Sequence, residues 1–337
     1  MPELYVQSSP HIGSPVSARL IMGHVLISLA PAAIFGVVIY GLPALGVILV
    51  SMAAAAAGEA LFRLVTRQKN RIRDLSAAVT GLLLALVLPP ATPLWMTALG
   101  AVFAVVVAKE FFGGLGANVF NPALSGRAFL LMSFPAAITT WTIPGTDGVS
   151  GATPLGIIKM GGDTAEVGRR LTEAGLSAGA DYASTLRTLF IGNRGGTIGE
   201  SSIMLIAAGC LYLLITKVID WRAPLAMLVS AFTLALLLGM DPVFGVLAGG
   251  LCFGAVFMAT DYTTAPMTAK GKVIFGAGAG IITVLIRKWG NYPEGVTYGI
   301  LIMNAVTPFL NRLLQKKYGY TPPVKARSAA AAKGAAK

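Results

Sequence analysis

The chain is built from apolar runs separated by short polar segments. Most runs have about 17 to 23 residues, the length at which an α-helix crosses a hydrocarbon core of roughly 30 Å. Two shorter runs, 75–88 and 224–239, suit tilted or buried helices. The pattern predicts an all-α integral membrane protein of about ten transmembrane helices, at residues 20–40, 42–65, 75–88, 94–112, 119–138, 201–219, 224–239, 243–259, 273–288 and 296–314.

Composition supports a lipid environment. Of the 337 residues, 55% are hydrophobic and 12% are charged, against roughly a quarter charged in an average soluble domain. The formal net charge is +12, but the basic residues lie in short loops and the tail, where they orient helices, so we expect no nucleic-acid partner. Cys210 and Cys252 lie in apolar runs without a Cys-x-x-Cys pair, which argues against an iron–sulfur or zinc site held by this chain.

Basic residues also predict the orientation. Most of the 26 Lys and Arg fall in segments that share one side if the N-terminus is cytoplasmic. We therefore expect a multi-pass protein of a bacterial cytoplasmic (inner) membrane with both termini inside. The predicted organisation is a cytoplasmic segment 1–19, a first five-helix repeat 20–143, an external loop 144–200, a second five-helix repeat 201–314 and a basic tail 315–337, expected to be disordered.

The two halves echo each other. The segment that starts Leu84-Ala-Leu-Val-Leu and ends Ala108-Lys-Glu110 lines up with one that starts Leu234-Ala-Leu-Leu-Leu and ends Ala259-Thr-Asp261. Five predicted spans precede the external loop and five follow it, so equivalent halves would have opposite orientations in the membrane. We interpret this pattern as two inverted five-helix repeats, an arrangement that many transporters share.

The external loop contains one motif that carries chemistry. It reads Asp147-Gly-Val-Ser150-Gly151-Ala152-Thr153. Gly, Ser and Asp are also common in ordinary turns, but the pattern Asp-x-x-Ser-Gly-Ala-Thr resembles a flavinylation motif. That resemblance implies FMN attached through a phosphoester to Thr153 by a flavin transferase, and a modified hydroxyl has to be exposed on a pliable loop.

Wider resemblance covers the chain from Ser8 to about Leu314. The segments that carry it include Ser8-Ser-Pro-His-Ile12, Val25-Leu-Ile-Ser-Leu-Ala-Pro-Ala32 and Phe120-Asn-Pro-Ala-Leu-Ser-Gly-Arg-Ala-Phe129. The chain resembles the RnfD family, the D subunits of Rnf electron-transport complexes. The B subunit of the sodium-translocating NADH:quinone reductase is a close relative with a longer N-terminal extension, and it is the alternative.

This resemblance implies a redox function. Rnf complexes pass electrons between reduced ferredoxin and NAD and couple the flow to transport of Na⁺ or H⁺. The implied cofactors are covalent FMN on the outer side and a noncovalent riboflavin within the bundle, and the implied partners are the A, B, C, E and G subunits of the Rnf complex. The flavin would carry the redox chemistry while the protein sets position and potential. A cofactor-free channel or transporter, using the repeat alone, is the alternative of another class.

Two asparagines are the candidates for the riboflavin. Asn118 and Asn121 would lie one turn apart on a helix face, and a flavin ring needs neutral donors and acceptors. Pro122 would then break the helix and free backbone groups to line a cavity. The alternative is a helix start, with Asn121 as the cap and Pro122 in the first turn.

Acidic residues at membrane depth are the candidates for ion coupling. Glu59, Glu110 and Asp261 are costly there unless they are paired or face water. The alternative is structural ion pairing, of Glu59 with Arg63 and of Glu110 with Lys109 or Arg127. Arg127 could instead meet a flavin phosphate on the outer side. We expect no metal site.

Overall fold

The computed structural model describes residues 17–69, 72–142, 153–192, 194–290, 292 and 294–314. These residues form helices and no strand, which confirms the all-α class. The first half contains α1 (Ala18–Tyr40), α2 (Leu42–Val65), η1 (Ile72–Asp74), α3 (Ser76–Leu86), α4 (Leu94–Val102), η2 (Phe103–Val107), η3 (Glu110–Phe112), α5 (Pro122–Ser133) and α6 (Pro135–Ile138). The rest contains α7 (Pro154–Lys159), α8 (Thr164–Glu173), α9 (Tyr182–Ile191), η4 (Ile198–Glu200), α10 (Ile203–Ile215), α11 (Arg222–Leu237), α12 (Pro242–Leu247), α13 (Leu251–Phe253), η5 (Gly254–Met258), α14 (Ala269–Trp289) and α15 (Val296–Leu314).

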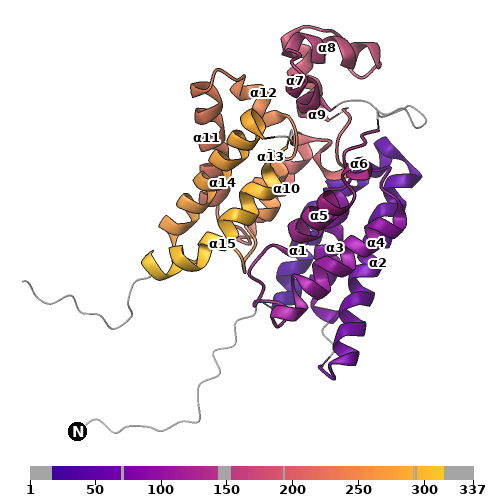
Figure 1. Ribbon diagram of the computed structural model, residues 1–337, viewed down its shortest axis with the longest axis vertical. Helices are drawn as coiled ribbons and strands as arrows, with labels where there is room; N and C mark the ends of the chain where they lie inside the picture. Colours follow the sequence, from indigo (N-terminus) through magenta and orange to yellow (C-terminus); the bar gives the residue numbers. More distant parts are fainter. Residues whose placement is uncertain are drawn as a thin grey trace, which may run out of the picture.

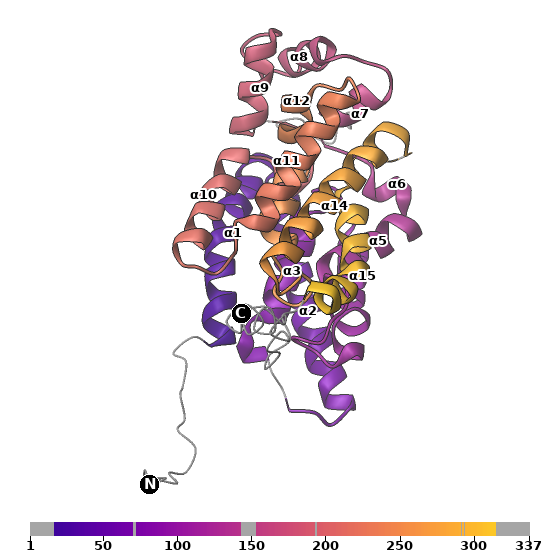
Figure 2. The ribbon, with the colours of Figure 1, turned by 90° about the vertical axis from the view of Figure 1, so that its left-hand side faces the viewer.

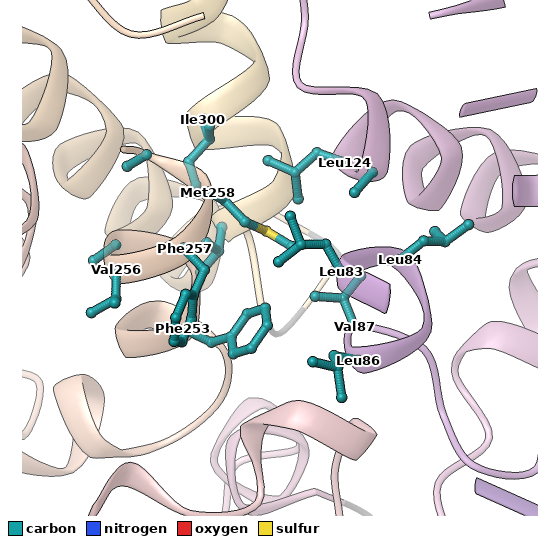
Figure 3. Packing of buried hydrophobic residues seen from close by; sticks show 14 of the residues in the cluster. Leu83, Leu84, Leu86, Val87, Leu124, Phe253, Val256, Phe257, Met258 and Ile300 are labelled. Carbon is teal, nitrogen blue, oxygen red and sulfur yellow. The ribbon is translucent and has the colours of Figure 1, made fainter. Parts of the chain in front are cut away.

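The helices form two bundles that lie side by side (Figure 1). One contains α2 to α5, and the other contains α11, α14 and α15. Buried side chains join them: Leu83, Leu86 and Val87 of the α3 segment face Phe253 and Met258 of the α13–η5 segment (Figure 3). The hydrophobic core is therefore continuous across the two halves.

Small residues allow close helix packing. A Cβ on Gly81 of α3 would lie 2.8 Å from the Cα of Met52 in α2. A Cβ on Gly276 of α14 would lie 2.2 Å from the carbonyl oxygen of Ala223 in α11. Because lipid supplies little hydrophobic drive for helix association, such backbone contact is a main source of stability in membrane bundles.

Helices occupy all ten predicted positions, but two of them are broken. The prediction of one continuous helix over 119–138 is wrong, since α5 starts at Pro122 and a new helix starts at Pro135. The run 243–259 is divided into α12, α13 and η5, with a break at Ala248 to Gly250. In the described part of the chain, four helices are long and apolar enough to cross a membrane: Ala18–Tyr40, Leu42–Val65, Leu94–Phe112 and Ala269–Trp289. The total of ten spans stays a prediction.

The echo between the halves has a structural counterpart. η2 and η5 are π-helices of five residues, and each ends just before one of the matched motifs, Ala108-Lys-Glu110 or Ala259-Thr-Asp261. π-helical turns are rare and are frequent at functional sites. The inverted relation of the two repeats stays a prediction.

Helices α7, α8 and α9 lie together at the end of the molecule opposite the start of α1 (Figures 1 and 2). They belong to the segment predicted as an external loop. Their apolar residues form a second, smaller core with α12, made of Leu155, Ile157, Val167, Leu171, Leu189, Phe244 and Ala248. This packing holds the segment that follows Thr153 against the break between α12 and α13.

Candidate functional site

A central cavity lies between the two halves. Its volume is about 80 Å³, below the roughly 300–1,000 Å³ of most small-molecule sites. Its apolar walls come from α1, α3, the end of α10 and η5. Its polar side chains are Ser76, Thr80, Lys109, Asn118, Asn121, Thr260, Asp261, Tyr262 and Thr263.

The structure brings both candidate asparagines to this cavity but not on a helix. Asn118 and Asn121 lie in the loop before α5, so the prediction that they share a helix face is wrong. Asn121 is the N-cap of α5, and its side-chain oxygen accepts a hydrogen bond from the backbone N–H of Leu124 at 3.1 Å. Pro122 therefore starts the helix, because a proline at the first position lacks only an N–H that would be unpaired anyway.

A buried network of four charges lies beside the cavity. Lys109 donates hydrogen bonds to the Glu59 carboxylate and to the Ser76 hydroxyl, each at 2.6 Å. Arg63 lies 3.0 Å from a carboxylate oxygen of Glu110 and 3.8 Å from one of Glu59. Two cations thus balance two anions, and all four side chains are buried.

This network shows which of the ion pairs considered for Glu59 and Glu110 are formed. Pairing of Glu59 with Arg63 is confirmed, although Lys109 is the nearer partner. Pairing of Glu110 with Lys109 or Arg127 is wrong, because Lys109 is held by Glu59 and Arg63 takes Glu110. Glu110 follows a π-helix and starts a 3-10 turn, so it does not point where a continuous helix would direct it. A direct ion role for Glu59 and Glu110 stays a prediction.

Asp261 lies in a different setting. Its carboxylate accepts hydrogen bonds from the hydroxyls of Thr263 and Thr264, at 3.0 and 2.9 Å. It lines the central cavity and also a second, more open cavity bordered by Lys217, Asp220, Arg222 and Lys272. Of the three candidate acids, Asp261 alone lines either of these cavities.

Thr153 is buried in the described structure. The residue is 7% exposed, and its hydroxyl accepts a hydrogen bond from the backbone N–H of Gly156 at 3.1 Å, which caps α7. The expectation of an exposed hydroxyl is therefore wrong for this folded form. The other motif residues, Asp147, Ser150, Gly151 and Ala152, lie outside the described residues.

Thr153 lies beside a group of buried charges. It lines a narrow cavity with Arg194, Glu200 and Glu294. Arg127 of α5 donates a hydrogen bond to Glu294 and lies 3.9 Å from Glu200. Arg287 of α14 donates to the backbone carbonyl oxygens of Glu294, Gly245 and Ala248. We call Arg127, Arg194, Arg287, Glu200 and Glu294 the outer arginine cluster.

Glu200 precedes α10, in the segment predicted to lie outside the membrane. Burial, together with the negative charge of Glu294, raises the pKa of Glu200 to about 7. The guanidinium groups of Arg127 and Arg194 oppose this rise without cancelling it. The carboxyl is thus protonated in a large share of molecules near neutral pH.

Sequence reasoning placed Arg127 near the outer flavin but missed its partners. Arg194 and Glu200 come from one segment and Arg287 and Glu294 from another, and no sequence spacing joins these two segments to each other or to Arg127. Each lies in or near an apolar run, and a charge in such a position is itself a signal of function. The sequence pattern suggests Lys109 only as a partner of Glu110, although Lys109 lines the central cavity.

The polar groups present suit the two flavins that the resemblance implies, although the central cavity, at about 80 Å³, has to widen to admit a flavin ring. The central cavity offers amide and hydroxyl groups for a neutral polar ring edge, and a cation at Lys109. Glu200 lines the cavity with Thr153, and Arg127 lies 3.9 Å from Glu200. Glu200 Oε1 and Arg127 Nε are buried without a hydrogen-bond partner in the described structure. A Cβ on Gly196, which lines the same cavity, would have no atom within 4 Å. Guanidinium groups beside open space suit a phosphate.

Comparison with known proteins gives the family. The sequence model described as the NQR2, RnfD, RnfE family matches residues 5–319. The chain is 45% identical over 325 residues to the D subunit of the proton-translocating ferredoxin:NAD(+) oxidoreductase complex of Clostridium ljungdahlii, covering 93% of this chain and 96% of the relative. It is 42% identical over 322 residues to the D subunit of the Na(+)-translocating ferredoxin:NAD(+) oxidoreductase complex of Acetobacterium woodii, covering 94% and 96%.

A third relative is more distant. The chain is 39% identical over 327 residues to the D subunit of the ion-translocating oxidoreductase complex of Stutzerimonas stutzeri, covering 90% of this chain and 92% of the relative. The family model and all three relatives extend over most of the chain, so they agree with the resemblance noted in the sequence. The chain belongs to the NQR2, RnfD, RnfE family.

Proposed function

We propose that this chain is the membrane-embedded D subunit of an ion-translocating ferredoxin:NAD⁺ oxidoreductase complex. In this proposal it carries covalent FMN on Thr153 and a noncovalent riboflavin in the central cavity, and both serve as electron relays coupled to Na⁺ or H⁺ transport. The observation that carries the proposal is identity of 45% over 93% of the chain to a protein of that name, together with Thr153 at the end of a flavinylation-like motif.

Burial of Thr153 limits when the flavin can be attached during folding. In the active site of the flavin transferase, the Thr153 hydroxyl attacks the flavin-side phosphorus of a flavin phosphoanhydride, which is the donor substrate of that enzyme. An Oγ–P bond forms, the anhydride P–O bond breaks, the second phosphate group leaves, and the hydroxyl proton passes to a base of the transferase. Because the folded residue is 7% exposed, the transferase acts before α7 docks or during a local opening of this segment.

The lining of the central cavity, more than its volume of about 80 Å³, supports the second cofactor. Bound riboflavin supplies redox chemistry, while this chain binds and orients it. The Asn118 and Asn121 amides offer neutral hydrogen bonds, and the apolar walls of α1, α3 and η5 exclude water. Lys109, fixed by Glu59 and Ser76, presents a cation to the same space.

The A, B, C, E and G subunits of an Rnf complex are the proposed partners, with the flavin transferase during maturation. The proposed location is the bacterial inner membrane, with both termini cytoplasmic and α7 to α9 outside. Placement of α7 to α9 opposite the start of α1 supports this orientation (Figure 2).

The test is an acid precipitation of the purified protein. We expect yellow colour both in the pellet, as covalent flavin, and in the supernatant, as riboflavin. Thr153→Val removes the first fraction, while Thr185→Val, at a buried threonine of α9, keeps both. A colourless protein from a host with the transferase contradicts the proposal and favours a cofactor-free transporter. Activity with NADH and quinone, without ferredoxin, would favour the quinone-reductase alternative.

A further inference from the structure

The outer arginine cluster has more positive than negative charge. Three guanidinium groups, which stay protonated in proteins, face two carboxylates. Arg127, Arg194, Arg287 and Glu200 are each at most 6% exposed, and the Glu294 side chain is 14% exposed. Protonation of Glu200 near neutral pH would increase the surplus, since its pKa is about 7. At the edge, the Lys159 ammonium donates to the backbone oxygen of Arg287 and adds a further cation.

Two of the arginines have backbone partners instead of carboxylates. Arg194 donates to the carbonyl oxygens of Leu247 and Glu200, each at 2.9 Å. Arg287 donates to those of Glu294, Gly245 and Ala248. Within the described residues, no carboxylate lies within 4.0 Å of a nitrogen of Arg194 or Arg287. Carbonyl groups satisfy the donors and hold the break between α12 and α13, but they do not neutralise the charges.

The network around Lys109 shows that such a surplus is not general in this protein. There, two buried cations meet two buried anions in direct contact. Burial of an uncompensated charge costs several kcal/mol by general estimates. A surplus retained beside Thr153 therefore indicates that an anion joins the outer cluster.

The position of Thr153 identifies that anion. Its side chain lines the same narrow cavity as Arg194, Glu200 and Glu294. A phosphodiester formed on its Oγ carries one negative charge, which offsets one unit of the surplus of the three arginines over the two carboxylates. Arg127 pairs with Glu200 and Glu294, which line this cavity, and its Nε is buried without a hydrogen-bond partner in the described structure. The cavity itself holds only about 10 Å³, but a Cβ on Gly196 in its wall would have no atom within 4 Å.

We infer that the outer arginine cluster is the binding site for the phosphodiester on modified Thr153. Through this contact the cluster holds the flavin linkage and α7 against the break between α12 and α13. This inference rests on the proposed flavinylation for the identity of the anion. The preference of the cluster for a negative charge at position 153 is testable without any flavin.

The first experiment compares Thr153→Asp with Thr153→Asn in full-length protein made without the transferase. Both residues are good helix N-caps, so the pair differs mainly in one negative charge. We expect the Asp variant to melt higher by about 2–4 °C, the shift that a change near 1 kcal/mol gives in a mid-sized protein. The advantage should disappear when Arg194→Gln is added, and should persist with Arg170→Gln, an exposed arginine of α8.

Two outcomes overturn the inference: an Asp variant no more stable than the Asn variant, or an advantage that survives Arg194→Gln unchanged. If Arg194→Gln does not fold, Arg127→Gln takes its place in the same comparison, with the same two outcomes. The arginine substitutions also distinguish an effect of the cluster from an effect of the helix dipole of α7. The N-terminus of α7 is present in every variant, so a dipole effect would survive loss of an arginine.

The second experiment uses protein with and without the flavin, with occupancy measured by intact mass. Modification should raise the melting temperature of the wild type more than that of Arg194→Gln, and an equal gain in both overturns the inference. Absence of any adduct on the wild type would contradict the proposed function instead. The comparison of Asp with Asn would still decide whether the cluster binds an anion there.

Discussion

Lys109 and Glu59 form a buried ion pair of 2.6 Å that joins the end of the first π-helix to α2. The Lys109 side chain is 2% exposed and that of Glu59 is not exposed. Lys109 also lines the central cavity. The pair therefore connects the packing of the first bundle to the polar wall of the proposed riboflavin site.

Removal of Lys109 should strongly destabilise the protein. Lys109→Met leaves the Glu59 carboxylate buried with only the more distant Arg63, and breaking a buried pair costs about 3–5 kcal/mol. The double variant Lys109→Met/Glu59→Gln should recover much of that loss. Denaturant midpoints in detergent measure both effects. A single variant as stable as the wild type would show that the ion pair does not hold α2.

Asn121 should act on the riboflavin as well as on the helix. Asn121→Ala removes the amide and the cap of α5, and the lost cap alone costs about 1 kcal/mol of stability. Asn121→Ser restores a capping hydroxyl but not the amide. We expect Ser to rescue stability while riboflavin content stays low in both variants. Full riboflavin in Asn121→Ser would limit Asn121 to capping.

Neutralisation of Asp261 should affect ion coupling more than neutralisation of Glu59 or Glu110. Only Asp261 lines the two cavities, whereas the other two carboxylates are held by Arg63 and Lys109. Asp261→Asn should weaken the dependence of electron flow on the transported ion about tenfold, equivalent to roughly 1.4 kcal/mol of lost interaction. Asp241→Asn keeps the cap of α12 and is the matched control. Equal ion dependence in Asp261→Asn and wild type would remove Asp261 from the ion path.

The proposed orientation of the chain predicts which residues a membrane-impermeant reagent can label from outside. Met160, 78% exposed at the end of α7, should react as Cys with a membrane-impermeant reagent from outside. Gln68, exposed after α2 on the side of the basic loops, should react as Cys only after the membrane is opened. Both tests use protein with Cys210 and Cys252 replaced by Ala. The reverse pattern would invert the proposed topology.

Sequence pattern predicted the helices well where apolar runs are uninterrupted, as in α1, α2 and α14. It failed at 119–138 and 243–259, because hydropathy does not respond to local backbone chemistry. Pro122 and Pro135 each start a helix, and the Gly249-Gly250 pair lies at the break before α13. The cap by Asn121 follows a local rule that the sequence does show, Asn followed by Pro at a helix start.

Several residues of the candidate sites could be chosen from the sequence, but the side chains that contact them could not. Asn118, Asn121 and Asp261 meet in one cavity, and Arg127 lies by Glu200 and Glu294, which line a cavity with Thr153. Long-range pairs such as Lys109 with Glu59 depend on how π-helix η2 turns the chain, and spacing does not encode that turn. Burial of Thr153 depends on packing of α7 against α12, which also lies beyond local sequence.

The intact mass of the full-length protein, produced with and without a flavin transferase, tests the central claim most directly. The proposed function predicts that the transferase adds the mass of one FMN less one water to the wild type and adds nothing to Thr153→Val. An unmodified wild-type mass in the presence of active transferase, or the same adduct on Thr153→Val, would contradict it.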